Sequence, residues 1–261
     1  MARITPLFSG SSGNCIAIGG SDSFVLIDAG VSAKRITEAL SSRGYDSSKL
    51  RGIFITHEHR DHISGVRVLA SRRGVPVYAT AGTLCAMDAG GDLCGVQAQV
   101  CPWEGVEIGG MQVKPFGTMH DTVESCGYVV TTADERRVAI ATDTGCVTEA
   151  MREAIVGCDV AYIESNHDKK MLEDGMYPFV LKQRILSPRG HLSNEQCAGE
   201  LQRILENGCA RFFLGHISRE NNRPELAMQS ARAVFDSCGA KAERDYILQA
   251  VPPEGLPTMV F

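Results

Sequence analysis

Short apolar runs separated by glycine, serine, asparagine or aspartate dominate the first 140 residues. Runs of this length, rich in β-branched and aromatic side chains, are typical of buried strands. They predict strands at 4–8, 14–18, 24–28, 52–56, 75–79, 97–101, 106–108, 111–116, 127–131 and 138–142. Apolar residues at helical spacing predict helices over 32–43 and 61–73.

The last third alternates strands with helices. Apolar runs predict strands at 160–164, 211–214 and 245–248, and helical spacing predicts helices over about 148–156, 192–207 and 224–237. Ser193 and Gln196 fit the N-cap and N3 positions of a capping box. The segment 166–190 fits a helix plus an exposed loop. The pattern favours an α/β fold, with two sheets flanked by helices in a single domain over 1–261.

Composition narrows the class of protein. The chain has 261 residues, of which 44% are hydrophobic and 22% charged, and its net charge of −5 provides no global attraction to nucleic acid. Bound cations can still supply positive charge at a phosphate. The ten cysteines include no C-x-x-C pair, and the first residues lack an apolar leader, so we expect reduced thiols, a cytoplasmic location and no membrane association.

The segment 56–62 reads Thr-His-Glu-His-Arg-Asp-His and follows an apolar strand. It places His57, His59, Asp61 and His62 where a strand gives way to a helix. Imidazole binds zinc, iron or manganese, and carboxylate binds harder cations. Three crowded imidazoles without a metal would repel when protonated and would lack partners when buried, so the segment predicts metal ligation.

Further candidate ligands follow later strands. His120 and His216 each come after an apolar run, and Asp143 ends the run Val-Ala-Ile-Ala-Thr before a turn. A lone residue of either type is more often a hydrogen-bonded histidine or a turn-capping aspartate. Because two cations 3.5–4 Å apart require a carboxylate between them, Asp143 is the candidate bridge of a dinuclear site. His167 lies in an otherwise polar loop.

This ordered set resembles the metallo-β-lactamase superfamily. The resemblance covers nearly the whole chain and implies a four-layered αβ/βα sandwich with a dinuclear metal site at the sheet edge. It implies that His57, His59 and His120 hold one divalent ion, that Asp61, His62 and His216 hold the other, and that Asp143 bridges them. Asp28, in Leu-Ile-Asp-Ala-Gly, would orient a ligand histidine.

Five motifs bring the chain closer to one branch of this superfamily. Ser-Gly-Ser-Ser-Gly-Asn-Cys, Thr-His-Glu-His-Arg-Asp-His, Glu-Ser-Asn-His-Asp, Gly-His-Leu-Ser-Asn-Glu and Gly-His-Ile-Ser-Arg-Glu-Asn are similar to the YycJ/WalJ/VicX subfamily, which is related to tRNA-processing nucleases. The resemblance implies 5′-to-3′ exonuclease action on DNA. The Gly/Ser loop offers Ser9, Ser11, Ser12 and Asn14 as phosphate contacts, although such loops are mostly plain turns.

The resemblance also implies catalytic roles. Metal-activated water is the nucleophile, Asp61 orients or takes its proton, and His191, held by Glu164, donates to the phosphate or the leaving oxygen. A basic rim that would track a phosphate backbone comprises Lys169, Lys170, Lys182, Arg184, Arg189, Arg219 and Arg223. Scattered solvated charges are the alternative interpretation of this rim.

Other functions stay open from the sequence. The same ligands would serve a cyclic-phosphate diesterase, a thioesterase or a lactonase, and a regulatory protein could keep the fold without catalysis. The donor set accepts zinc, manganese or iron. DNA is favoured over RNA as substrate, and self-association is undecided.

Overall fold

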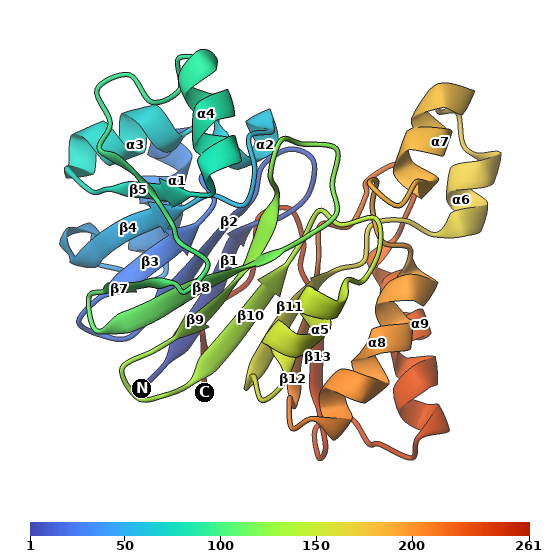
Figure 1. Ribbon diagram of the computed structural model, residues 1–261. Coiled ribbons are helices and arrows are strands. Elements are labelled where there is room, and N and C mark those ends of the chain that lie inside the picture. The colour runs from blue at the N-terminus through green and yellow to red at the C-terminus, as the bar shows by residue number, and fades with distance from the viewer. The chain divides into compact units, whose positions relative to one another are not determined.

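The computed structural model describes residues 1–261, which form two compact units (Figure 1). Unit 1 comprises Met1–Phe116, Thr122–Arg136 and Pro253–Phe261. Unit 2 comprises Gly117–Asp121 and Arg137–Pro252. The chain enters and leaves unit 1 more than once, so neither unit is a simple half of the sequence.

A seven-stranded sheet forms the centre of unit 1, in the order β14-β1-β2-β3-β4-β5-β6. Its first strands make antiparallel hairpins, and β3, β4, β5 and β6 run parallel. Short connections suffice for the hairpins, whereas each parallel pair needs a crossover segment. The strands are β1 (Arg3–Phe8), β2 (Cys15–Gly19), β3 (Phe24–Ile27), β4 (Leu50–Phe54), β5 (Val77–Ala79), β6 (Ala98–Val100) and β14 (Met259–Val260).

The crossover segments of unit 1 contain its helices. These are α1 (Ala33–Ser42), the 3-10 turn η1 (Ser47–Lys49), α2 (Arg60–Ile63), α3 (Val66–Arg73) and α4 (Ala81–Ala89). Helix α1 buries Ile36 and Leu40 in a cluster that includes Leu26 and Ile53 of the sheet. Burial of this apolar face is what holds the helix, since isolated helices of ten residues are marginal in water.

The strands β7 (Val106–Ile108), β8 (Met111–Gly117) and β9 (Cys126–Thr131) also contribute to unit 1, except for Gly117. Aromatic side chains join β9 to the central sheet. Phe54 stacks on Tyr78 with ring centroids 4.8 Å apart and meets the edge of Tyr128 at 5.6 Å. Tyr128 Oη donates to the Ile55 carbonyl at 2.8 Å, so this buried hydroxyl has a partner at the end of β4.

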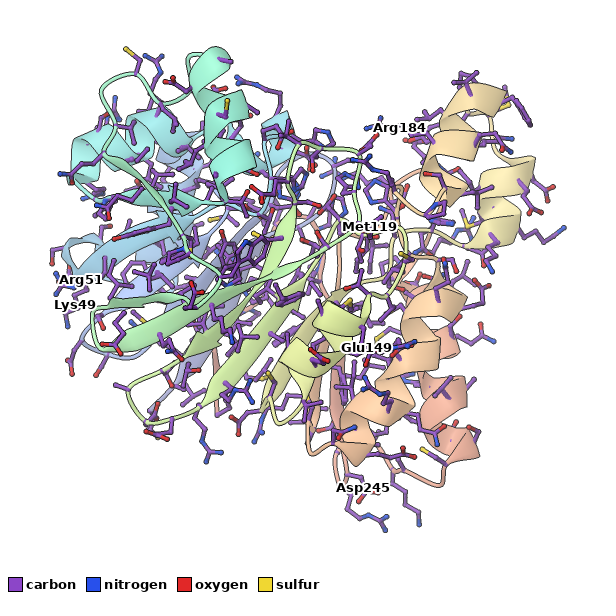
Figure 2. All side chains as sticks on the ribbon, in the orientation of Figure 1. Lys49, Arg51, Met119, Glu149, Arg184 and Asp245 are labelled. Atoms are coloured by element: carbon purple, nitrogen blue, oxygen red, sulfur yellow. The ribbon has the colours of Figure 1, made fainter.

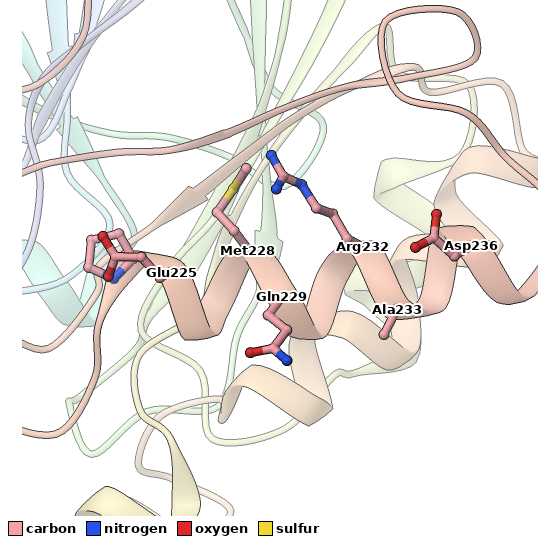
Figure 3. A pocket seen from close by; sticks show the side chains of 7 residues that line it. Glu225, Met228, Gln229, Arg232, Ala233 and Asp236 are labelled. Carbon is pink, nitrogen blue, oxygen red and sulfur yellow. The ribbon is translucent and has the colours of Figure 1, made fainter.

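Four parallel strands form the sheet of unit 2: β10 (Arg137–Ala141), β11 (Val160–Glu164), β12 (Arg211–Gly215) and β13 (Ile247–Ala250). Its helices are α5 (Glu149–Ile155), α6 (Lys169–Asp174), α7 (Phe179–Leu186), α8 (Asn194–Glu206) and α9 (Pro224–Ser237). Helix α9 buries Phe235 against Phe212, with ring centroids 5.1 Å apart. Its other face lines a shallow pocket of mixed charge, with Glu225, Met228 and Arg232 (Figure 3).

Most predicted elements match the structure within a few residues, and the capping box of Ser193 and Gln196 is confirmed. The single helix predicted over 61–73 is wrong, because the chain breaks between α2 and α3. Gly65 N donates to the Ala29 carbonyl at 2.8 Å, and a Cβ there would lie 2.1 Å from the Val31 oxygen. This close approach turns the backbone away from a continuous helix.

Two other predictions need correction, and one helix was missed. The last strand begins at Ile247 rather than 245, because the Asp245 carboxylate accepts from Lys241 N (2.8 Å) in the preceding turn. Helix α4 was not predicted, and 166–190 holds two helices rather than one. The single domain stays a prediction. None of the ten cysteines is in a disulfide, and no helix has both the length and the apolar character to cross a membrane.

Candidate metal centre

The histidine-rich segment of unit 1 lies directly after β4, and α2 begins inside it at Arg60. His57 and His62 are fully buried, while His59 and Asp61 are partly exposed. His57 Nε2 lies 3.2 Å from His59 Nδ1, and the His57 and His62 rings are 4.0 Å apart. His62 Nε2 lies 3.5 Å from the Asp61 carboxylate. The four predicted ligands of unit 1 therefore form one cluster.

Buried side chains beneath the cluster orient its imidazoles. The Asp28 carboxylate is 2.8 Å from His62 Nδ1 and accepts from both the backbone N (2.9 Å) and the hydroxyl (2.9 Å) of Thr56. An aspartate can only accept here, so the proton of His62 lies on Nδ1 and the lone pair on Nε2. Thr56 Oγ1 also lies 3.0 Å from His57 Nδ1. Histidines that bind metals are commonly oriented by such partners.

The Gly/Ser loop of unit 1 lies against this cluster through Asn14. The Asn14 side chain bonds Gly10 N (2.8 Å) and places Nδ2 3.0 Å from His62 Nε2. Its backbone N donates to the Asp61 carbonyl at 2.8 Å. Ser9 is buried, whereas Ser11 and Ser12 are exposed. The loop thus supports Asp61 and His62, and only Ser11 and Ser12 face solvent.

The second cluster lies in unit 2 at the carboxyl ends of its parallel strands. Asp143 follows β10, Glu164 ends β11, and His216 follows β12. Together with His191, which precedes α8, they offer ligand atoms that all lie within 4.8 Å of one another. His216 Nδ1 is 3.4 Å from the Asp143 carboxylate. The ends of neighbouring parallel strands are where sites of open α/β sheets form.

Glu164 is the centre of this second cluster and is fully buried. Its Oε2 accepts from Asp143 N at 2.9 Å and lies 2.9 Å from His191 Nδ1 and 3.1 Å from His216 Nδ1, while Oε1 accepts from Leu192 N at 2.6 Å. Burial disfavours the ionised carboxylate, but the charge and hydrogen bonds of the two histidines outweigh it and lower the pKa of Glu164. Burial of His191 disfavours its protonated form, but the charge and hydrogen bond of Glu164 favour that form more strongly. The pKa of His191 is therefore raised.

His120 joins the same unit from the end of β8. Its Nδ1 donates to the Gly190 carbonyl at 2.9 Å, and its Nε2 lies 3.8 Å from the Asp143 carboxylate. Burial lowers the pKa of His120, with the neighbouring charges smaller in effect. The neutral imidazole with Nε2 as acceptor is the form that coordinates metals.

Three residues of these clusters have left-handed backbone. Asp28, Asp143 and His216 have φ angles of 61°, 55° and 50°. Non-glycine residues adopt this region rarely, aspartate more readily than most, and it costs of the order of 1 kcal/mol or more. Each of the three stands directly or closely after a strand end. Backbone strain is thus concentrated at residues of the two clusters.

A buried amide network, which the sequence did not predict, joins the three loops of unit 2. Asn194 and Asn222 exchange two side-chain hydrogen bonds of 2.9 Å, and Asn222 Nδ2 also reaches the carbonyls of Ser165 (2.9 Å) and Asn166 (3.0 Å). Asn166 Nδ2 donates to the His216 carbonyl at 3.0 Å. The network therefore fixes the segments that carry Glu164, His191 and His216. The only sequence signal was that Asn166 and Asn194 each follow a serine in two of the motifs, whereas Asn222 lies just beyond the third.

His167, predicted in a polar loop, is 1% exposed. It forms an isolated bridge with Ser193, and its carbonyl accepts from Asn194 N at 2.9 Å. Neither ring nitrogen has a hydrogen-bond partner. Burial lowers the pKa of His167 to about 4. The loop is polar in sequence, but its histidine belongs to the interior of unit 2.

Comparison with known proteins identifies the family of the chain. The model of the β-lactamase superfamily domain matches residues 24–217. Exodeoxyribonuclease YycJ of Bacillus anthracis is 36% identical over 97% of this chain and 96% of its own length. Exodeoxyribonuclease WalJ of Streptococcus pneumoniae is 40% identical over 85% of this chain and 83% of its own. The chain belongs to the metallo-β-lactamase superfamily, in its YycJ/WalJ branch.

Comparison with solved structures identifies the fold of the chain. The metallo-β-lactamase fold protein YhfI of Bacillus subtilis matches with a TM-score of 0.72 at 15% identity, covering 99% of this chain and 98% of that one. The predicted metallo-β-lactamase fold class is thus confirmed, with a helix layer and a sheet in unit 1 and a sheet and a helix layer in unit 2. The chain is a metal-dependent hydrolase of this superfamily.

Proposed function

We propose that the chain is a dinuclear-metal-dependent phosphodiesterase that removes nucleotides from the 5′ end of DNA. The observation that carries the proposal is the pair of relatives named exodeoxyribonuclease, at 36% and 40% identity over most of both chains. Five motifs from the Gly/Ser loop to the final histidine motif support the same activity. The substrate is DNA rather than RNA, and the protein acts in the cytoplasm without a membrane partner.

The donor set fits two divalent ions. In the proposed arrangement His57, His59 and His120 would hold one ion, Asp61, His62 and His216 would hold the other, and Asp143 would offer its carboxylate to both. Imidazole and carboxylate donors suit zinc, manganese or iron. In unit 1 this assignment is supported by the four candidate ligands that cluster above Asp28. In unit 2 it is supported by His120, whose Nδ1 donates to a carbonyl and leaves Nε2 as the acceptor, and by the short distance between His216 and Asp143. Bound ions supply a hydroxide nucleophile and neutralise phosphoryl charge.

Side chains of the protein would carry out proton transfer and bind the phosphate. Asp61, partly exposed beside His62, accepts or orients the proton of the attacking water. His191 donates from its second ring nitrogen to a phosphate oxygen or to the leaving oxygen, because Glu164 accepts from its Nδ1 at 2.9 Å. The neighbouring carboxylate favours the protonated form that can donate. Ser11 and Ser12, with Ser9 and Asn14 behind them, contact the terminal phosphate.

The test is a cleavage assay on 5′-phosphorylated, labelled single-stranded and double-stranded DNA with zinc, with manganese or with chelator. Stepwise shortening from the 5′ end that requires metal is the expected result. Asp61→Asn should abolish it, and Asp88→Asn, an exposed aspartate of α4, should not. A thioester and bis-(p-nitrophenyl)phosphate run alongside. Intact DNA with turnover of either small substrate would refute exonuclease action and favour a small-molecule hydrolase.

A further inference from the structure

Helices α6 and α7 of unit 2 present large apolar side chains to solvent. Met176 is 97% exposed, Phe179 74% and Val180 79%. These three and Leu186 are four of the twelve exposed large hydrophobic residues of the chain, within eleven consecutive positions. Single exposed hydrophobic residues are normal, but a contiguous group marks an interaction site. Figure 1 shows both helices at one extremity of unit 2.

The exposed residues share one side of α7. Phe179, Val180, Gln183 and Leu186 follow the spacing of neighbours on a helix surface, and Leu181 and Ile185 on the other side are partly buried. Helix α7 has no fully buried residue. The exposed side of α7 therefore carries Phe179, Val180 and Leu186 together with the polar Gln183 and Arg184.

The base of α7 contacts the candidate metal centre of the same unit. Arg189 Nε donates to the His120 carbonyl at 3.0 Å, and His191 N donates to the Ile185 carbonyl at 3.0 Å. Arg184 forms an ion pair with Asp121, the residue after His120 (Figure 2). The C-terminal end of α7 is thus hydrogen-bonded to the segments that carry His120 and His191.

The charge of this segment is opposite to that of the whole chain. Residues 168–190 contain Lys169, Lys170, Lys182, Arg184 and Arg189 against Asp168, Glu173 and Asp174, in a chain of net charge −5. Lys182 is bound to the Glu173 carbonyl at 2.6 Å, and Lys170 pairs with Asp174 at 3.1 Å, both in exposed positions where such bonds exchange readily with other partners. The segment therefore combines a local excess of positive charge with exposed apolar side chains.

We propose that the exposed face of Met176, Phe179, Val180 and Leu186 binds the DNA strand next to the end being cleaved, which rests on the proposed function. Bases stack on Phe179 and its apolar neighbours, and the basic residues contact the phosphates. Aromatic platforms with nearby lysine and arginine are the general solution for single-stranded nucleic acid. A second copy of the chain fits less well, since a symmetric interface would bring two net-positive hairpins together.

The test compares Phe179→Ala with Phe179→Tyr and with Val156→Ala, a control at an exposed apolar residue elsewhere in unit 2. Affinity for a 5′-phosphorylated single-stranded 12-mer is measured by fluorescence anisotropy in chelator. Phe179→Ala should weaken binding about ten-fold, and Phe179→Tyr and Val156→Ala should stay within about two-fold. Lys182→Gln should reduce the slope of log affinity against log salt by about 0.7.

The results distinguish DNA binding by this face from the exonuclease activity itself. Unchanged affinity in Phe179→Ala together with an unchanged salt slope in Lys182→Gln would overturn it. Loss of self-association by Phe179→Ala in sedimentation, without weaker DNA binding, would assign the surface to a second copy and also overturn it. Failure of the wild-type protein to cleave DNA at all would refute the exonuclease instead. Val180→Ser serves as a second variant if Phe179→Ala fails to fold.

Discussion

Glu164 should be the most sensitive carboxylate of unit 2, and Glu164→Gln tests this. The side chain is fully buried and accepts from Asp143 N, Leu192 N and the Nδ1 atoms of His191 and His216. Glutamine has nearly the same shape but replaces one oxygen by a donor. If the glutamine amide nitrogen takes the place of Oε1, its N–H group meets the N–H group of Leu192 at a separation of 2.6 Å, and neither can accept a hydrogen bond. The opposite orientation places the amide nitrogen against three donors.

The expected loss of stability is worked out for the less unfavourable orientation, in which the amide nitrogen faces Leu192. One buried donor loses its partner, and the two histidines keep an acceptor but lose its charge. Removal of one partner of a buried ion pair costs about 3–5 kcal/mol in the free energy of unfolding. For a chain of this size that lowers Tm by on the order of 10 °C. Looser His216 and His191 should also weaken metal affinity or turnover by about 10- to 100-fold.

The assay is thermal unfolding in chelator, followed by metal content and DNA hydrolysis after loading. Glu200→Gln is the matched control, because Glu200 pairs with Arg152 at 2.5 Å but near the surface, where a pair contributes at most about 1 kcal/mol. A Glu164→Gln protein within 2 °C of wild type, or no less stable than Glu200→Gln, would show that the charge of Glu164 is not what holds the loops.

Four further outcomes are expected. His191→Ala should lower turnover about 100-fold with metal content unchanged, and lost metal would mean that His191 is a ligand. Asp143→Ala should at least halve the bound metal, measured by plasma mass spectrometry. Asn222→Ala should cost about 3 kcal/mol in urea unfolding, since it removes the Asn222 partner of the buried Ser165 carbonyl and of Asn194 Nδ2. The pKa of His167 is about 4 when folded and about 6.5 when unfolded, so His167 contributes stability above pH 6.5 that is lost as the pH falls toward 4. His167→Gln should flatten unfolding free energies between pH 7 and 4.5, and an equal pH slope in both proteins would contradict this.

Prediction from the sequence succeeded where the signal is local. The strand that ends at Glu164 and the capping box of Ser193 follow from residues within a few positions of each other. Prediction from the sequence failed where a segment distant in the chain packs against the helix, or where a helix has no apolar face. Gly65 interrupts a helical pattern because Ala29 and Val31 approach it, and α4 shows no helical period because its apolar residues lie on all sides.

The sequence by itself determined the chemistry of this protein: which histidines and carboxylates are present, in what order, and at which strand ends. Ligand identity is a property of residue type, and strand ends can be read from short apolar runs. Only the tertiary structure decided how those groups are held. The tautomer of His62 depends on Asp28, the ionisation of Glu164 on two histidines, and the loops of unit 2 on Asn194 and Asn222. These partners lie 27 to 52 residues apart in the chain, so hydrogen bonds formed on folding, rather than local sequence, select them.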